Sequence, residues 1–223
     1  MQNNIWWLGL GYERGETRYL RDLLQPGMTA FDVGANVGYY TLLAALQVGD
    51  AGSVHSFEPV ADQYAALCAN IHRNHFRNVV ANKKIVSDKA GSMAIRYGPA
   101  DNSGAASVVD QPGLGDRTET VAAVALDDYA DASTPGPIHV IKIDTEGHEL
   151  AVLKGATRIL QHRQTVVLVE IRSPHLQRAG VTRDDVYSFM SQLGYQPFAI
   201  RNDGTLAELS APQDGKLIVF KPR

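Results

Sequence analysis

The stretch FDVGANVGYY, from Phe31 to Tyr40, decides the fold class of this chain. An apolar run ends at Asp32, a glycine-rich turn follows from Gly34 to Gly38, and the next residues, YYTLLAALQ, have the composition of a helix. A strand that passes through a glycine turn into a helix is the usual way in which an α/β fold brings its backbone close to a nucleotide-like ligand. The stretch therefore predicts an α/β fold with a ligand at this turn.

The middle of the turn differs from a dinucleotide-binding turn. The fingerprint GxGxxG uses its second glycine to make room for a pyrophosphate, and this chain has Asn36 at that place. The turn therefore favours a nucleoside without a pyrophosphate, and S-adenosylmethionine, with adenine, ribose and an amino-acid tail, fits that description. The residues of the turn that we expect to contact it are Gly34, Ala35, Asn36, Gly38 and Tyr39.

Acidic residues at two strand ends complete the expected cofactor site. Glu58, in SVHSFEPV, lies 20 positions after Gly38, where a carboxylate accepts hydrogen bonds from the ribose hydroxyls. We expect Asp32 to organise the glycine turn and to bind the ammonium group of the ligand; a turn or helix-capping role is the alternative. The third strand, VVANKKIVSD, ends at Ser87 and Asp88, which form either the rim of the adenine site or a plain turn.

Strand-like and helix-like runs alternate along most of the chain, which predicts a doubly wound, mostly parallel sheet with helices on both faces. The turn at Asn202, Asp203 and Gly204 predicts a C-terminal antiparallel hairpin, for seven strands in all. The expected strands span 29–33, 53–57, 79–86, 139–143 and 166–171 before the hairpin, and 92–96 and 120–126 flank a Gly-, Pro- and Ser-rich loop. The expected helices span 16–24, 38–47, 61–75, 148–160 and 183–193, with Thr182 as the N-cap of the last.

Composition limits the classes of partner. The 223 residues, 44% hydrophobic and 20% charged, predict a single domain over 1–223. We expect an N-terminal cap at 1–28 and a flexible loop at 97–118, which is either a substrate-side loop or a plain mobile insertion. A net charge of −3 argues against a nucleic-acid binder with a broad basic surface. Without a run of about 18 apolar residues or a basic N-terminal leader, we expect no membrane partner and a cytoplasmic protein.

The stretch IHVIKIDTEGHE predicts a catalytic strand end. Because side chains alternate along a strand, Lys142, Asp144 and Glu146 share one face as far as the strand extends. Charges at the carboxyl end of a central strand are unfavourable in a core. We expect one acid to deprotonate a hydroxyl of the acceptor, with His148 as the other candidate base. The alternatives are a Lys142 ion pair that only orders the loop and a solvent-facing His148. Asp144, Glu146 and Glu170 offer ligands for a hard cation, but we expect no metal.

These features together favour methyl transfer to a hydroxyl of a small molecule. Displacement at a sulfonium needs proximity, alignment and a base, and no covalent nucleophile. The chain has no GxSxG, Walker lysine loop, HExxH or Cys/His cluster, which lowers the weight of those reaction classes. The alternatives are a non-catalytic adenosyl-binding domain and a nicotinamide-dependent oxidoreductase, which would need the missing middle glycine.

The chain resembles the FkbM-type methyltransferases. The matching pieces are GYERGETRYLRDLL, FDVGANVGYYT, SFEP, SDKAG, DNSGAAS, LDDY, IKIDTEGHELAVLKGA and LVEIR. The resemblance implies a class I methyltransferase fold, which is Rossmann-like, and O-methylation of sugar or natural-product hydroxyls in biosynthesis. It also implies that Tyr12, Glu13 and Thr17 close over the cofactor.

The N-terminal aromatic residues leave a homodimer open. Trp6 and Trp7 pack either on the edge of the sheet or against a second subunit. Trp6, Trp7, Tyr12, Tyr39, Tyr40 and Tyr97 are also candidates for an apolar or sugar-stacking pocket.

Overall fold

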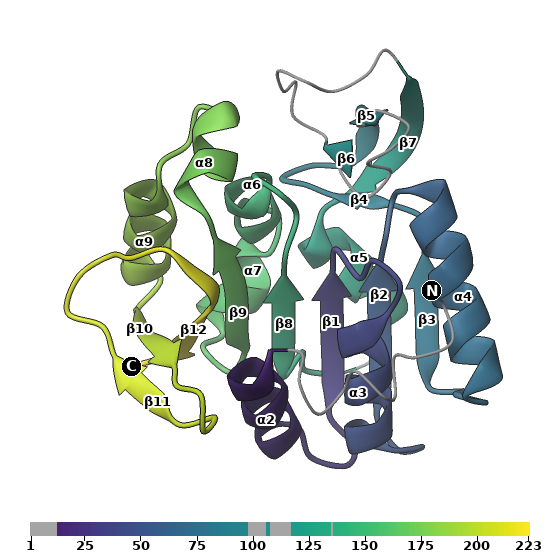
Figure 1. Cartoon of the computed structure of the whole chain (residues 1–223), viewed down its shortest axis with the longest axis horizontal. Helices are drawn as coiled ribbons and strands as arrows, with labels where there is room; N and C mark the ends of the chain where they lie inside the picture. The colour runs from purple at the N-terminus through teal and green to yellow at the C-terminus, as the bar shows by residue number, and fades with distance from the viewer. Residues whose placement is uncertain (1–12, 98–105, 108–116, 135) are drawn as a thin grey trace.

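The computed structural model describes residues 13–97, 106–107, 117–134 and 136–223. Its centre is an eight-stranded sheet with helices on both faces. A separate four-stranded sheet lies beyond the end to which the parallel strands point, at the upper right of Figure 1. This arrangement confirms the predicted α/β class.

The main sheet has the order β11-β10-β12-β9-β8-β1-β2-β3. Its five parallel strands are β1 (Thr29–Val33), β2 (Ser53–Phe57), β3 (Val79–Asn82), β8 (Val140–Ile143) and β9 (Val166–Ile171). The remaining strands, β10 (Tyr195–Ile200), β11 (Leu206–Glu208) and β12 (Gly215–Pro222), pair antiparallel. The predicted C-terminal hairpin is therefore confirmed, and the sheet has one strand more than the seven expected because β11 pairs with β10.

Two apolar layers hold the helices on the sheet. On one face, α2 (Arg14–Leu23) and α3 (Tyr39–Val48) pack on side chains such as Ala30 and Val140. On the other, Phe31, Ile141 and Ile143 belong to an apolar cluster with buried residues of five helices. These are α5 (Leu126–Ser133), α6 (Glu149–Lys154), α7 (Thr157–Gln161), α8 (Ser173–Arg178) and α9 (Arg183–Gln192). Helix α4 (Ala61–Arg73) lies beside β3. The alternation predicted for β8 is confirmed from Val140 to Ile143, with Val140 on one face and Ile141 and Ile143 on the other. Because the strand ends at Ile143, Asp144 and Glu146 lie in the loop that follows it.

The strand expected over 79–86 is two strands in different sheets, so that prediction was wrong. Strand β3 ends at Asn82, whereas β4 (Ile85–Val86) pairs parallel with β7 (Thr118–Val124) of the small sheet. Lys83 lies between them and forms a 2.7 Å ion pair with Glu119 of β7. The chain therefore leaves the main sheet where its charged pair of lysines begins.

The small sheet has the order β4-β7-β5-β6, where β5 spans Gly91–Tyr97 and β6 spans Ala106–Ser107. Ile85, Ile95 and Val121 form its core. The strand expected to reach Leu126 ends at Val124, because Leu126 begins α5. Most of the loop expected over 97–118 lies outside the described residues.

Tertiary contacts also divide the helix expected over 148–160. A Cβ atom at Gly155 would lie only 2.0 Å from the carbonyl oxygen of Ser87, so α6 and α7 meet at a glycine that touches another loop. Helix α8 was not expected at all. Thr182 caps α9 as predicted, in a capping box with Asp185.

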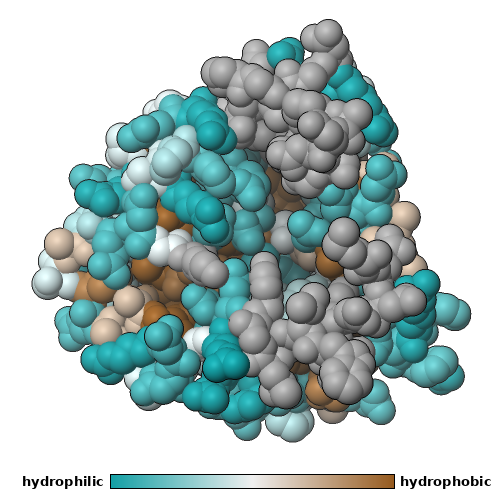
Figure 2. All heavy atoms as spheres, in the orientation of Figure 1, coloured by the Kyte–Doolittle hydropathy of each residue, from teal (hydrophilic) through white to brown (hydrophobic). Residues whose placement is uncertain are grey.

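The face seen in Figure 2 is mostly hydrophilic, and its hydrophobic residues gather toward the left, over the C-terminal hairpin. Phe198, Ile200 and Leu206 of this hairpin pack partly buried against the core. Among the described helices, none combines the length and apolar character needed to cross a bilayer.

Candidate functional site

A hollow opens at the carboxyl ends of β1, β2 and β8, beneath the small sheet. It encloses about 780 Å³ of empty space, part of which is open to solvent. Its walls include the glycine turn, the segment after β2, β4 and the loop after β8. The predicted residues Gly34, Asn36, Glu58, Asp144, Glu146 and His148 all line it.

The glycine turn is fixed to the end of β2. The backbone N–H groups of Gly34 and Ala35 both donate to the carbonyl oxygen of Phe57, at 3.0 and 3.1 Å. Gly34 has a φ of +76°, and a Cβ atom there would lie 1.7 Å from the carbonyl oxygen of Asp144. Only glycine lets the two loops approach this closely.

Glu58 lies where a ribose-binding carboxylate is expected. It is 5% exposed; its Oε2 atom accepts a 2.7 Å hydrogen bond from Asn36 N–H, and its Oε1 atom accepts a 2.9 Å bond from Val60 N–H. Burial raises the pKa of Glu58, while these two N–H groups and Lys142 oppose the rise. Each carboxylate oxygen can accept a further bond, so the group can still bind hydroxyls of a ligand in the hollow.

Asp32 and Lys142 form a buried network behind the glycine turn. Asp32 accepts a 2.6 Å hydrogen bond from the Thr41 hydroxyl and lies 3.4 Å from Lys142 Nζ. Lys142 donates to the carbonyl of Gly34 at 3.1 Å and lies 3.6 Å from Asp144. Burial lowers the pKa of Lys142, but Asp32 and Asp144 outweigh burial, so its pKa lies above the usual value. The lysine therefore stays charged and ties the turn to β8.

Helix α2 docks on the start of α3. The Thr17 and Tyr39 hydroxyls lie 2.8 Å apart, and Tyr40 donates a hydrogen bond to Glu13. These contacts place the start of α2 beside the start of α3, next to the glycine turn. Tyr12, expected to close over the cofactor, lies outside the described residues, as do Trp6 and Trp7.

His148 and Ser87 connect the loop after β8 with the end of β4. The Nε2 atom of His148 lies 3.0 Å from the Ser87 hydroxyl, which also contacts Asp88 at 3.2 Å. Burial lowers the pKa of His148 and Asp88 opposes this effect. A neutral imidazole therefore lines the hollow, on the side of the small sheet, rather than facing solvent.

The loop after β8 holds Asp144 and Glu146 at the mouth of the hollow. Glu149 fixes this loop, because its Oε1 atom accepts hydrogen bonds from the N–H groups of Thr145 and Gly147, both at 3.0 Å. Glu146 has a φ of +56°, which is unfavourable for a residue with a side chain. The loop thus holds a strained glutamate whose side chain is half exposed.

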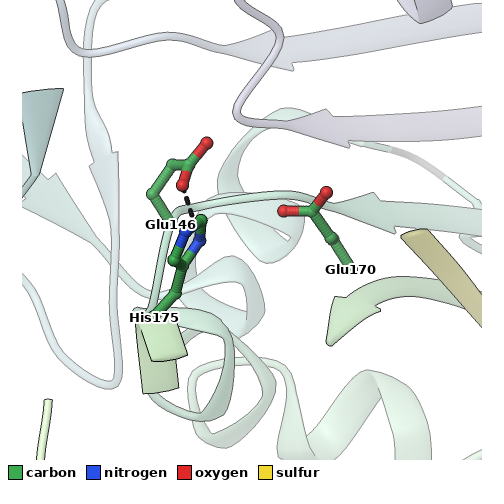
Figure 3. Close-up of side chains that lie close together, drawn as sticks. All are labelled: Glu146, Glu170 and His175. Carbon is green, nitrogen blue, oxygen red and sulfur yellow. Dashed lines mark ion pairs between the residues drawn. The ribbon is translucent and has the colours of Figure 1, made fainter. Parts of the chain in front are cut away.

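His175 was not predicted as a site residue from the sequence. Helix α8 brings its Nδ1 atom to 2.6 Å from Oε2 of Glu146, and Glu170 of β9 points toward the same place (Figure 3). Glu170 pairs with Arg172 at 2.9 Å, and burial, followed by the charge of Asp144, raises the pKa of Glu170 to about 8. The Ser-Pro pair that starts α8 was a usable signal for a short helix.

This sheet order, with a cofactor-type hollow at the carboxyl ends of the parallel strands, defines the class I methyltransferase fold. A crystal structure of methyltransferase FkbM from Methylobacillus flagellatus has the same fold. Its TM-score is 0.54 at 15% identity, and the match covers 92% of this chain but 50% of that chain.

The family follows from the sequence. Residues 32–197 match the model of the methyltransferase FkbM domain, so the chain belongs to the FkbM methyltransferase family, and S-adenosyl-L-methionine is its cofactor. The chain is 29% identical, over 182 residues, to the hexuronic acid methyltransferase AglP of Haloferax volcanii, covering 80% of this chain and 69% of the relative. It is 41% identical to the 31-O-demethyl-FK506 methyltransferase FkbM of Streptomyces tacrolimicus over 76 residues, which are 34% of this chain and 28% of that protein.

Proposed function

We propose that the protein transfers a methyl group to a hydroxyl oxygen of a small molecule, either a sugar or another natural product. The observation that carries this proposal is the position of Asp144 and Glu146, two carboxylates at the mouth of the cofactor hollow. The two named relatives support it, since one acts on a hexuronic acid and the other on an O-demethylated compound. A nucleic-acid acceptor fits the net charge of −3 less well.

The cofactor supplies an electrophilic methyl group when it is bound. In this proposal Glu58 binds the ribose hydroxyls, and the turn at Gly34, Ala35, Asn36 and Gly38 positions the amino-acid end. Asp32 acts on that end from behind the turn, through Lys142 and the carbonyl of Gly34. The adenine side of the site is bordered by His148, Ser87 and Asp88. The start of α2 is held beside the site by Thr17 and Tyr39.

Asp144 is the proposed base. As the methyl carbon bonds to the acceptor oxygen, the carbon–sulfur bond breaks and its electron pair remains on sulfur. The hydroxyl proton passes to the Asp144 carboxylate and then to water. Lys142, 3.6 Å away, places a positive charge beside this carboxylate, and Glu146 orients the acceptor from the half-exposed side. His148 is the second candidate base, facing the hollow from the other end of the loop.

Calorimetric titration with S-adenosylhomocysteine, with NAD in parallel, tests the cofactor site. We expect micromolar binding of the first compound alone. Glu58→Gln, which keeps the shape of the side chain, should weaken binding by about tenfold or more because it loses a charge-assisted bond to a hydroxyl. Asp128→Asn, on the exposed surface of α5, is the matched control. Unchanged binding by Glu58→Gln would refute the ribose assignment.

Activity is tested with a panel of hexuronic acids, neutral sugars and hydroxylated macrolides, with mass spectrometry to detect the methylated product. Asp144→Asn should lower turnover by about a hundredfold or more while cofactor binding persists. Turnover that survives in Asp144→Asn combined with Glu146→Gln would refute the catalytic assignment. Cofactor binding without turnover on any hydroxyl would favour the non-catalytic adenosyl-binding alternative.

A further inference from the structure

Two residues beside Glu146, namely Glu170 and His175, have no part in the methyl-transfer proposal. Glu146, Glu170 and His175 come from three separate elements: the loop after β8, the end of β9 and helix α8. Each offers one ligand atom, and these atoms all lie within 4.8 Å of one another (Figure 3). Two ligands on opposite sides of a divalent cation are about 4 to 5 Å apart, so one ion can contact all three.

The contact between Glu146 and His175 is not an ordinary hydrogen bond. Nδ1 of His175 and Oε2 of Glu146 lie 2.6 Å apart, yet this buried nitrogen has no hydrogen-bond partner among the described residues. Distance is therefore satisfied and alignment is not. A buried imidazole nitrogen without a hydrogen-bond partner is available as a ligand for a metal ion.

Glu170 gives the cluster a buried carboxyl group. Its side chain is 9% exposed, and Arg172 contacts its Oε1 atom at 2.9 Å. The carboxyl group of Asp144 lies beside it. Lys142 and Arg172 are the cations beside these carboxyl groups, and Lys142 is shared with Asp32. A bound cation would supply a further partner for them.

We propose that Glu146, Glu170 and His175 form a binding site for a divalent transition-metal ion. One imidazole and two carboxylates suit ions such as Mn²⁺ and Zn²⁺ better than Mg²⁺, which prefers oxygen ligands alone. The side chain of Glu146 is 50% exposed, so a ligand from solvent could reach an ion held here.

The site lies at the rim of the cofactor hollow, because Glu146 and Asp144 also line that hollow. Resting on the proposed function, we assign the open position of the ion to the acceptor hydroxyl. Coordination lowers the pKa of a bound hydroxyl group, so its proton passes more readily to Asp144. The acceptor class would then be molecules with two adjacent oxygens, such as vicinal diols and hydroxy acids, which chelate the ion.

Electron paramagnetic resonance with Mn²⁺ tests the site without any need for activity. The full chain, freed of metal with a chelator, is titrated with Mn²⁺ while the free-ion signal is followed. We expect one bound ion per chain, with nitrogen-14 modulation in pulsed spectra from the His175 imidazole. His175→Ala and Glu170→Gln should each weaken binding by about tenfold or more. His72→Ala and Glu208→Gln, at exposed positions on α4 and β11, should leave it unchanged.

Binding of S-adenosylhomocysteine checks that each variant is folded. Absence of nitrogen-14 modulation in the wild-type protein would overturn the site, and this readout does not depend on any variant. Equal Mn²⁺ binding by wild type and His175→Ala would also overturn it, since the ion would then be adventitious. Bound Mn²⁺ whose removal leaves methyl transfer unchanged would overturn the role in acceptor binding while the proposed function stands.

Discussion

At the scale of single residues, Gly34 is where two loops of the site come closest. Gly34→Ala would place a Cβ atom 1.7 Å from the Asp144 carbonyl and keep an unfavourable φ of +76°. The φ alone costs about 1–2 kcal/mol, and separating the loops adds to this cost. We expect a larger loss of unfolding free energy than this, and weaker binding of S-adenosylhomocysteine, measured by denaturation and calorimetry.

Gly27→Ala is the matched control for this prediction. Gly27 has a similar φ of +85°, but nothing lies within 4 Å of the Cβ position. Gly27→Ala should therefore lose only the unfolding free energy that the unfavourable φ costs, and it should keep full cofactor affinity. Equal losses of stability and affinity in the two variants would contradict the steric argument.

A second residue-scale prediction concerns the buried lysine. Lys142→Met leaves Asp32 buried beside the glycine turn without its cation, and we expect it to cost about 3–5 kcal/mol of unfolding free energy. Adding Asp32→Asn should restore part of the loss, because the uncompensated charge is removed. A double-mutant cycle measured by urea denaturation gives the coupling. Strictly additive losses would show that the two side chains do not stabilise each other.

At the scale of elements, the capping box of α9 predicts a pH dependence. Hydrogen bonds from Thr182 hold the pKa of Asp185 below its usual value. A carboxyl group with a lowered folded-state pKa contributes stability above its unfolded pKa of about 3.9, and this contribution is lost as the pH falls through the folded pKa. Asp185→Asn should therefore be less stable than wild type at neutral pH, and the difference should shrink in acid.

Urea denaturation at neutral pH and near pH 3 measures this difference. Asp184→Asn is the control, since this neighbour lies in the same first turn but has no part in the box. A difference between wild type and Asp185→Asn that stays constant with pH would contradict the assignment of the lowered pKa to the capping box.

The elements that the sequence predicted well are those with a local cause. Strands β2 and β9 begin and end at the residues that the sequence predicted. Asn36 and Glu58 lie at neighbouring strand ends, and the structure joins them by a hydrogen bond. The division of the expected helix into α6 and α7 at Gly155 depends on the carbonyl of Ser87 in a distant loop. The pairing of Ile85–Val86 in a second sheet depends on β7. Such contacts leave no periodic signal in the chain.

His175 shows the same limit within the site. Its role depends on the docking of α8 against the loop after β8, where a Cβ atom at Gly147 would lie 2.6 Å from the carbonyl oxygen of His175. The sequence shows the histidine and the glycine but not their approach. The carboxylates at the ends of β8 and β9 were predictable because parallel strands end at a common edge.

At the scale of the whole molecule, two sheets enclose one hollow. Asn36 and Glu58 lie at the main sheet, while Ile85 and Ile95 belong to the small one. A ligand that contacts both should therefore slow local opening of both. We expect S-adenosylhomocysteine to reduce hydrogen exchange in the glycine turn and in β5, measured by mass spectrometry.

The C-terminal hairpin is the internal reference for this experiment. Strands β10 and β11 lie at the far edge of the main sheet, away from the hollow (Figure 1). Their exchange should stay unchanged when the ligand binds. Protection of the hairpin but not of β5 would mean that the ligand binds elsewhere.

The backbone of Glu146 has a consequence for how this protein would evolve. Its φ of +56° is a conformation that glycine adopts at little cost, so Glu146→Gly would relieve backbone strain while deleting the carboxylate. A laboratory selection for heat resistance alone would therefore favour this change, whereas a selection for product formation would remove it. Selection for stability and selection for activity would therefore favour different residues at position 146.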